Sequence, residues 1–166
     1  QYTNIIDAIS HGASDGMKIS INVIAMLIGF IALMALINAL LGMIYPGFGL
    51  NVIFGYLFYP LAWAMGVPHA EVMQVATMMG QKLTINEFVA YTNLIAVKAT
   101  MSPKALAIAS FALCGFANFS SVGIQIGGIG ELAPSRRADL AKLGLKALLC
   151  GTLASYLSAT IAGILM

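Results

Sequence analysis

Charged side chains are scarce in this sequence. Its 166 residues include 8 basic and 6 acidic side chains, which make up 8% of the chain, while hydrophobic residues make up 60%. An ordinary soluble domain is about 25% charged. So few charges cannot cover the surface of a soluble fold of this length. The composition therefore excludes a cytosolic enzyme, a disordered chain and a nucleic-acid-binding protein, and it predicts an integral membrane protein or part of one.

Cysteine is also rare, and the residues of common catalytic sites are missing. Cys114 and Cys150 lie in apolar runs without metal-ligating neighbours, so we interpret both as packing residues and expect no disulfide and no metal site. The sequence has no HExxH motif and no Ser, His and Asp set typical of a hydrolase. We therefore expect neither enzymatic activity nor a cofactor. The net charge of +2 is too small to indicate a polyanionic partner such as nucleic acid.

The first apolar run is long enough to cross a membrane. Residues 19–44 carry no charge, and a helix of this length exceeds a hydrocarbon core of roughly 30 Å. The preceding residues 5–18 alternate apolar and polar faces with a helical period, which predicts an amphipathic helix at the membrane surface. Asn22 and Asn38 are the strongly polar residues of the uncharged run. We interpret them as helix–helix hydrogen-bonding residues rather than as a ligand site.

The next apolar run is ambiguous. Residues 48–68 are long enough to span, but glycines and Pro60 interrupt them, and their tyrosines and tryptophan are residue types typical of the membrane interface. We favour an external interfacial helix, with a membrane-spanning helix as the alternative.

Residues 71–97 predict a re-entrant hairpin. Two apolar arms of about ten residues flank a polar stretch that reads GQKLTINE. Each arm forms about 15 Å of helix, which is half the thickness of a bilayer core. A non-helical tip at that depth is tolerated where it is buried in protein or lines a cavity.

A second long apolar segment is interrupted near its middle. Within residues 105–133, Gly115 and the run from Asn118 to Ser121 favour an unwound or bent helix, because Asn and Ser side chains bond to nearby backbone. Residues 143–166 form the last predicted helix, whose many small residues suit close packing.

Four basic residues lie between the last two apolar segments, and they determine the expected topology. They are Arg136, Arg137, Lys142 and Lys146. Such a cluster is typical of a cytoplasmic loop. The last helix then ends outside, the hairpin enters from outside, and residues 19–44 run from the cytoplasm outwards.

Three polar residues are expected to meet near the middle of the membrane. Glu87 follows the hairpin tip, and Asn118 and Ser121 lie where the other helix breaks. An intramembrane carboxylate usually marks a substrate or an ion pathway. One carboxylate, one amide and one hydroxyl suit a polyhydroxylated ligand such as a sugar ring. The alternative is a salt bridge between Glu87 and Lys82, with Asn118 and Ser121 only satisfying backbone groups.

The same residues resemble a known family. Gly80–Leu83 followed by Asn86–Tyr91, which reads NEFVAY, resembles the second re-entrant hairpin of the concentrative nucleoside transporters. Ala112–Ser121 resembles the broken helix that follows that hairpin. Further likenesses run through nearly the whole chain: Ser10–Asn22, Ala35–Asn38, Gly130–Arg137 and Ala159–Gly163.

This resemblance implies an all-α integral membrane fold that forms half of an inverted-repeat transporter. Residues 1–70 would hold the interfacial helix, a scaffold transmembrane helix and the external interfacial helix. Residues 71–166 would be the transport-domain half. It implies that Glu87, Asn118 and Ser121 bind the ribose of a nucleoside and that Phe116 is an aromatic contact in the same site.

The resemblance also implies a function for the whole protein. It would be a symporter coupled to Na⁺ or H⁺, a homotrimer in the bacterial inner membrane. The sequence starts at Gln1 and lacks a signal-peptide pattern, so we expect a C-terminal part that does not transport alone. The coupling ion would be held mainly by the missing upstream half. The alternative is a channel-like or regulatory membrane subunit whose Glu87 lies in an ion or proton path.

Overall fold

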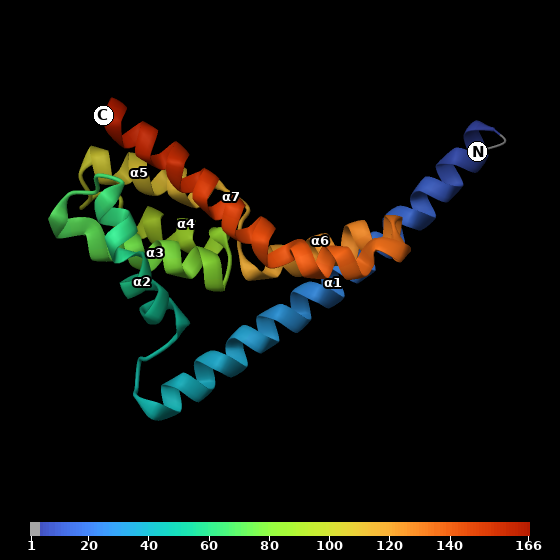
Figure 1. Ribbon diagram of the computed structural model, residues 1–166, viewed down its shortest axis with the longest axis horizontal. Coiled ribbons are helices and arrows are strands. Elements are labelled where there is room, and N and C mark those ends of the chain that lie inside the picture. Colours follow the sequence, from blue (N-terminus) through green and yellow to red (C-terminus); the bar gives the residue numbers. More distant parts are fainter. Residues whose placement is uncertain (1–3) are drawn as a thin grey trace.

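The computed structural model describes residues 4–166, apart from the side chain of Met26. These residues form helices joined by short connections and contain no strand, in agreement with the predicted all-α fold. The elements are α1 (Ile5–Ile44), α2 (Leu50–Ala64), η1 (His69–Glu71), α3 (Val72–Thr84), α4 (Glu87–Val97), α5 (Pro103–Cys114), α6 (Phe119–Leu132), η2 (Pro134–Arg136) and α7 (Arg137–Leu165). Figure 1 shows α1 as a long diagonal rod and the other helices as an elongated bundle.

Helix α1 is a single helix of 40 residues. It begins where the Asn4 side chain accepts a hydrogen bond of 2.8 Å from the backbone N–H of Asp7, as an N-cap residue does. Residues 5–18, expected to form a separate surface helix, continue into the uncharged run without a break. Their two glycines cost about 1 kcal/mol each relative to alanine, which weakens a helix but does not end it.

Helix α2 is shorter than the apolar run that contains it. Its 15 residues rise about 22 Å, less than a bilayer core of roughly 30 Å. It lies along α3 and has few contacts with α1. Close packing requires small residues here, because a Cβ atom on Gly80 would lie 3.0 Å from the carbonyl oxygen of Asn51. The structure therefore packs α2 against the hairpin, while its position relative to the membrane stays a prediction.

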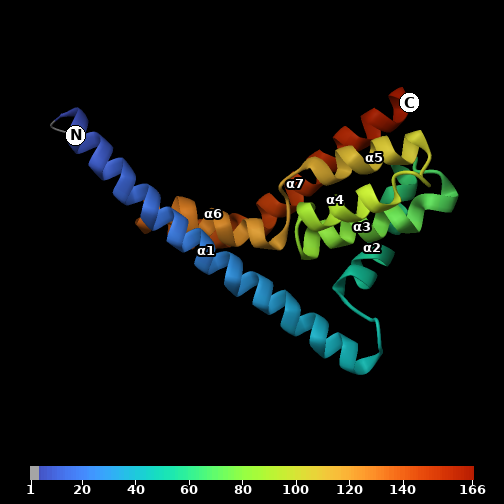
Figure 2. The ribbon, with the colours of Figure 1, turned by 180° about the vertical axis from the view of Figure 1, so that it is seen from behind.

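Helices α3 and α4 form a helical hairpin, and α5 and α6 form the predicted broken helix. The re-entrant position of the hairpin in a membrane stays a prediction. Both arms of the hairpin contact α5, and the buried hydrophobic core lies mainly in α2, α3, α5 and the facing side of α7. Figure 2 shows the hairpin lying beside α5, with α7 running back along α6 and α5. The break in the second segment spans residues 115–118.

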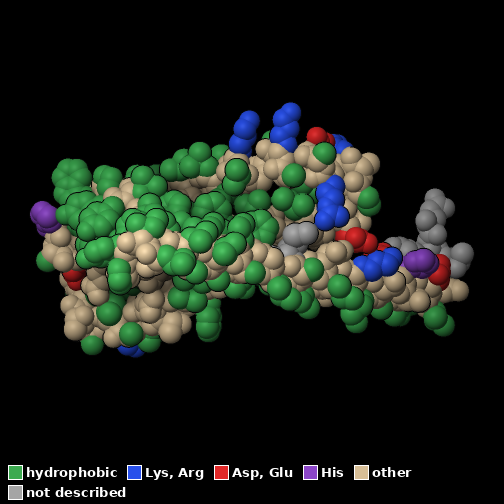
Figure 3. Space-filling view, turned by 90° about the horizontal axis from the view of Figure 1, so that it is seen from below, with side chains coloured by type: hydrophobic (Ala, Val, Ile, Leu, Met, Phe, Trp, Pro, Cys, Tyr) green, Lys and Arg blue, Asp and Glu red, His purple; other side chains and the backbone are tan. Residues whose placement is uncertain are grey.

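Three helical segments are long and apolar enough to cross a membrane. They are Ile5–Ile44, Pro103–Leu132 and Pro134–Leu165. Charged side chains gather at the end of the molecule that holds the start of α1 and the corner between α6 and α7, and the surface beyond it is mostly hydrophobic (Figure 3). This distribution fits a helical membrane protein.

The ends of these segments meet in the order that alternating spans require. At one end, the Asn22 side chain donates a hydrogen bond of 3.1 Å to Oε2 of Glu131 and joins α1 to α6. At the other end, Gly163 of α7 lies against Ile108 of α5. Asn22 is thus a helix–helix contact, as predicted. Asn38 instead accepts a hydrogen bond of 2.8 Å from the backbone N–H of Leu50, at the start of α2.

Candidate functional site

The candidate site lies where two interruptions of helical structure meet. The turn between α3 and α4 and the break between α5 and α6 each end in an asparagine that caps the next helix. Oδ1 of Asn86 accepts a hydrogen bond of 2.9 Å from the N–H of Val89. Oδ1 of Asn118 accepts one of 2.7 Å from the N–H of Ser121. Asparagine is a preferred N-cap residue because its short side chain satisfies a free backbone donor, so the sequence itself places both helix starts.

A hydrogen bond joins the two interruptions directly. Nδ2 of Asn118 donates to Oε2 of Glu87 over 2.7 Å. Glu87 is the first residue of α4, where the positive end of the helix dipole stabilises a carboxylate. Asn118 is buried, with 1% of its surface exposed, and Glu87 is half-buried. The structure therefore brings together the carboxylate and the amide that the sequence predicted as partners in one site.

The hydroxyl of Ser121 is already engaged in capping α6. Its Oγ donates a hydrogen bond of 2.6 Å to the carbonyl oxygen of Asn118 and accepts one of 3.1 Å from the N–H of the same residue. Together with the bond from the Asn118 side chain this forms a capping box. Ser121 therefore has no hydrogen left to donate to a ligand, although its oxygen can still accept.

The remaining hydrogen-bonding capacity of the site is small and well defined. Within residues 4–166, Oε1 of Glu87 accepts no hydrogen bond, and the second N–H of the Asn118 amide has no acceptor. One strong acceptor and one donor thus lie beside each other. This pair matches two neighbouring hydroxyl groups, of which one donates and the other accepts.

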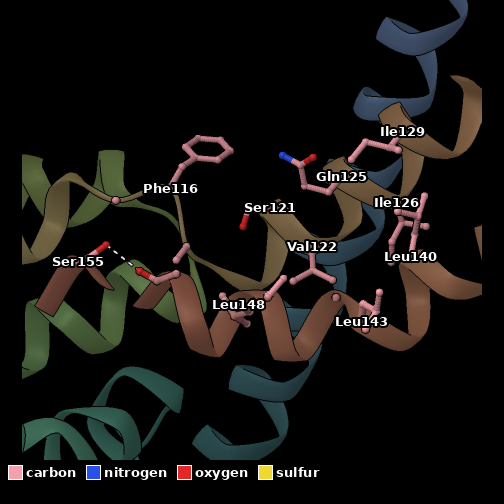
Figure 4. Close-up of a pocket in the computed structure, with 15 residues that line it drawn as sticks. Phe116, Ser121, Val122, Gln125, Ile126, Ile129, Leu140, Leu143, Leu148 and Ser155 are labelled. Carbon is pink, nitrogen blue, oxygen red and sulfur yellow. Dashed lines mark hydrogen bonds between the residues drawn. The ribbon is translucent and has the colours of Figure 1, made fainter. Parts of the chain in front are cut away.

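Phe116 lies in the same break, two residues before Asn118, and lines a cleft. The cleft has a volume of about 480 Å³ and lies between the break, α6 and α7, with Phe116, Ser121 and Gln125 among its lining residues. Figure 4 shows the ring of Phe116 and the amide of Gln125 on the same side of the cleft, opposite leucines of α7. Phe116 is 57% exposed, so its face is open to a flat ligand group. Gln125 was not predicted as a site residue.

The predicted alternative, a salt bridge between Lys82 and Glu87, is not formed. Among the described residues no ion pair joins them within 4 Å. Nζ of Lys82 instead donates a hydrogen bond of 2.9 Å to the carbonyl oxygen of Ala112. The other half of that alternative is observed, because Asn118 and Ser121 do satisfy backbone groups.

Further polar contacts hold the hairpin in place. The Tyr91 hydroxyl donates a hydrogen bond of 2.6 Å to the carbonyl oxygen of Ser110, which fastens α4 to α5. Nδ2 of Asn93 donates one of 2.8 Å to Oε1 of Gln81 across the two arms. Sequence reasoning missed both contacts, because a helix pattern does not identify which residues of another helix face it.

The base of the hairpin is fastened to the start of α5. The carboxylate of Glu71 accepts a hydrogen bond of 2.6 Å from the N–H of Ser102 and one of 2.5 Å from its hydroxyl. Ser102 is the N-cap residue of α5, so Glu71 also lies at the positive end of that helix. The hairpin is thereby held at its base and at its tip by the same neighbouring helix.

The described residues contain no group of three or more His, Cys, Asp or Glu side chains that could hold a metal ion. The groups that the candidate site offers are a carboxylate acceptor on Glu87, an amide donor on Asn118 and the aromatic ring of Phe116.

Known proteins resemble this chain along almost its whole length. The family model described as "Na+ dependent nucleoside transporter C-terminus" matches residues 1–163. The uncharacterized transporter YutK of Bacillus subtilis is 53% identical, over 96% of this chain and 41% of YutK. The nucleoside permease NupC of Helicobacter pylori is 42% identical, over 99% of this chain and 42% of the permease. A variant of CNTnw in an outward-facing state has a TM-score of 0.92 at 44% identity, covering 99% of this chain and 43% of CNTnw. The chain thus spans about two fifths of the length of these relatives.

Proposed function

Because this chain belongs to the family described as "Na+ dependent nucleoside transporter C-terminus", we propose that it carries the sugar-binding half of a nucleoside site in a cation-coupled symporter. The family predicted from the hairpin and helix-break motifs is confirmed, and its members are transporters rather than enzymes. Transport itself requires the remainder of the longer protein, since this chain spans about two fifths of its relatives.

The observation that carries this proposal is the bond between Asn118 and Glu87. It fixes the carboxylate so that Oε2 is occupied and Oε1 is free, and it leaves one amide hydrogen of Asn118 unused. A ribose has two adjacent hydroxyl groups. One would donate to Oε1 of Glu87 while the other accepts from Nδ2 of Asn118.

The surroundings of the pair suit the rest of a nucleoside. The cleft at the same helix break is lined by Ser121 but not by Glu87 or Asn118. It lies within the size range of small-molecule sites, about 300–1,000 Å³, and is lined mostly by apolar side chains. Phe116, which lies in the break, is the aromatic residue among those that line this cleft. An apolar, flat nucleobase would contact this ring, while the sugar is held at the helix break.

We propose Na⁺ or H⁺ as the coupling ion, with its ligands mainly in the part of the protein that precedes this chain. The proposed location is the bacterial inner membrane, with the α6–α7 corner on the cytoplasmic side. A homotrimer is proposed as the assembly, and the apolar side chains exposed along α1 support this because they need a lipid or protein partner.

Binding of uridine to the purified full-length protein tests this function. We expect Glu87→Gln to weaken uridine binding by about 10- to 100-fold, because a hydrogen bond to a charged group contributes about 1.5–3 kcal/mol. Glu131→Gln is the matched control, since Glu131 lies at the other end of α6 and should leave the dissociation constant within about twofold.

The affinity of deoxy analogues locates the sugar. In the wild-type protein, 2′-deoxyuridine and 3′-deoxyuridine should bind more weakly than uridine, because each leaves one member of the Glu87–Asn118 pair without a partner. Equal affinity for all three ligands would show that these residues do not bind the ribose. A wild-type protein that binds no nucleoside but conducts ions through a path blocked by Glu87→Gln would support the channel-like alternative instead.

A further inference from the structure

Lys82 is the one charged side chain that is buried within residues 4–166. Only 1% of its surface is exposed, and it lies in the last turn of α3, next to the hairpin tip. Burial of an ammonium group is unfavourable unless polar partners replace the lost water. A buried lysine in a membrane protein therefore requires a specific explanation, and the proposed binding site does not use it.

The partners of Lys82 are a helix end and an aromatic ring. Its Nζ donates to the carbonyl oxygen of Ala112 over 2.9 Å and lies 5.7 Å from the centre of the Tyr156 ring. Helix α5 ends at Cys114, so the Ala112 carbonyl is one of the last four, which have no partner within their own helix. The C-terminal end of a helix carries partial negative charge and favours a cation.

The ammonium group also borders the first residue of the break. A Cβ atom on Gly115 would lie 3.4 Å from Nζ of Lys82 and would overlap the hydroxyl of Ser155. The chain passes between Lys82 and α7 at this glycine and reaches Asn118 three residues later. The position of the end of α5 therefore constrains the position of Asn118, the N-cap residue of α6.

The two charges at the hairpin tip thus complement the helix dipoles at the two sides of the break between α5 and α6. Lys82 lies at the negative C-terminal end of α5, and Glu87 bonds to the residue that caps the positive N-terminal end of α6. Lys82 and Glu87 also interact electrostatically, although they are not paired. Discontinuous helices in transporters commonly bind ions at such ends. Here both charges, Lys82 and Glu87, are side chains of the protein.

We propose that Lys82 is a positioning residue for sugar recognition. Its ammonium group holds the end of α5 and so keeps Asn118 within hydrogen-bonding distance of Glu87. Lys82 does not contact the ligand. This inference rests on the proposed function, because it concerns the same ribose site.

The test compares Lys82→Met with Lys98→Met in the full-length protein. Methionine keeps most of the length of lysine and removes the charge, and Lys98 is an exposed lysine at the end of α4. Dissociation constants are measured for uridine and 2′-deoxyuridine, together with Tm. We expect Lys82→Met to weaken uridine binding about tenfold or more and to reduce the preference for uridine over 2′-deoxyuridine to about twofold. Lys98→Met should leave both values unchanged.

The ratio of the two dissociation constants separates positioning from simple destabilisation. A variant that is only less stable has fewer active molecules, but each keeps the wild-type preference for the ribose. An unchanged ratio in Lys82→Met would overturn the proposal even if Tm falls. Lys82→Gln, which retains an N–H donor without the charge, is measured in parallel. If the methionine variant does not fold, the ratio of the uridine and 2′-deoxyuridine dissociation constants in Lys82→Gln tests the proposal. A wild-type protein that binds neither ligand would reject the proposed function, and this inference with it.

Discussion

Nδ2 of Asn118 lies 2.7 Å from Oε2 of Glu87, so the residue that caps α6 also holds the carboxylate that begins α4. The two tasks use opposite ends of one amide group. Oδ1 accepts from the backbone N–H of Ser121, which leaves the NH₂ group to face Glu87. The start of α6 therefore determines the orientation of the amide, and the amide in turn fixes the carboxylate.

Asn118→Ser separates these two tasks. Serine is a good N-cap residue, but its side chain is too short to reach Glu87. We expect this variant to bind uridine about tenfold more weakly while Tm changes little. Asn118→Ala loses the cap as well and should lower the free energy of unfolding by a further ~1 kcal/mol. Calorimetry and thermal unfolding of the full-length protein measure the two effects, and equal loss of Tm in both variants would contradict this division.

Glu71 should contribute to the stability of the hairpin base. It accepts two hydrogen bonds from Ser102, and removal of a charged acceptor leaves two donors unpaired. We expect Glu71→Ala to lower the free energy of unfolding by about 2 kcal/mol and Ser102→Ala to lower it by less, because the backbone N–H of residue 102 remains. A double-mutant cycle gives the coupling between them. Additive effects would show that the contact does not stabilise the protein.

Gly115 is expected to tolerate no side chain. A Cβ atom there would overlap the hydroxyl of Ser155 and approach its Cβ to 3.1 Å. We expect Gly115→Ala to lower Tm and to weaken uridine binding, since overpacking typically costs about 1–3 kcal/mol. Ser155→Gly, introduced into the same protein, removes both atoms and should restore part of the loss. If the double variant recovers neither Tm nor uridine affinity, the added methyl group must clash with another neighbour, for example Nζ of Lys82.

Labelling of single cysteines tests the sidedness of the α6–α7 corner. Cys114 and Cys150 are exposed, so both are first replaced by alanine. We expect a membrane-impermeant maleimide applied outside intact cells to label a cysteine appended after Met166 but not Ser135→Cys. The basic residues of the corner favour the cytoplasmic side. The reverse pattern would invert the topology of every segment.

The sequence was sufficient to place the interruptions of the helices. The polar run between two short apolar arms predicted the hairpin, and Asn86 begins its second arm as an N-cap residue. Gly115 and Asn118 predicted the break, which the structure places at residues 115–118. These features are local, because a cap or a helix end depends on the residues next to it.

Contacts between helices could not be predicted in the same way. The nearest opposite charge in the sequence suggested Glu87 as the partner of Lys82, whereas the partner is a backbone carbonyl of α5. The Ala112 carbonyl is free to accept because α5 ends two residues later, at Cys114. A pattern of side-chain types does not reveal which backbone carbonyl is free. For a similar reason Arg137 and Lys142, expected to precede the last helix, lie in α7. Basic residues are typical of the cytoplasmic edge of a membrane, and a helix can continue through that edge.

The short arms of the hairpin have a consequence for how the protein enters its membrane. With 13 and 11 residues, α3 and α4 rise about 20 Å and 16 Å, and neither can cross a core of roughly 30 Å. At their polar tip, Lys82 donates a hydrogen bond to a carbonyl group of α5, which leaves the ribosome later than the hairpin does. If the hairpin is re-entrant, as predicted, we therefore expect Lys82 to gain this buried partner only after α5 has been made.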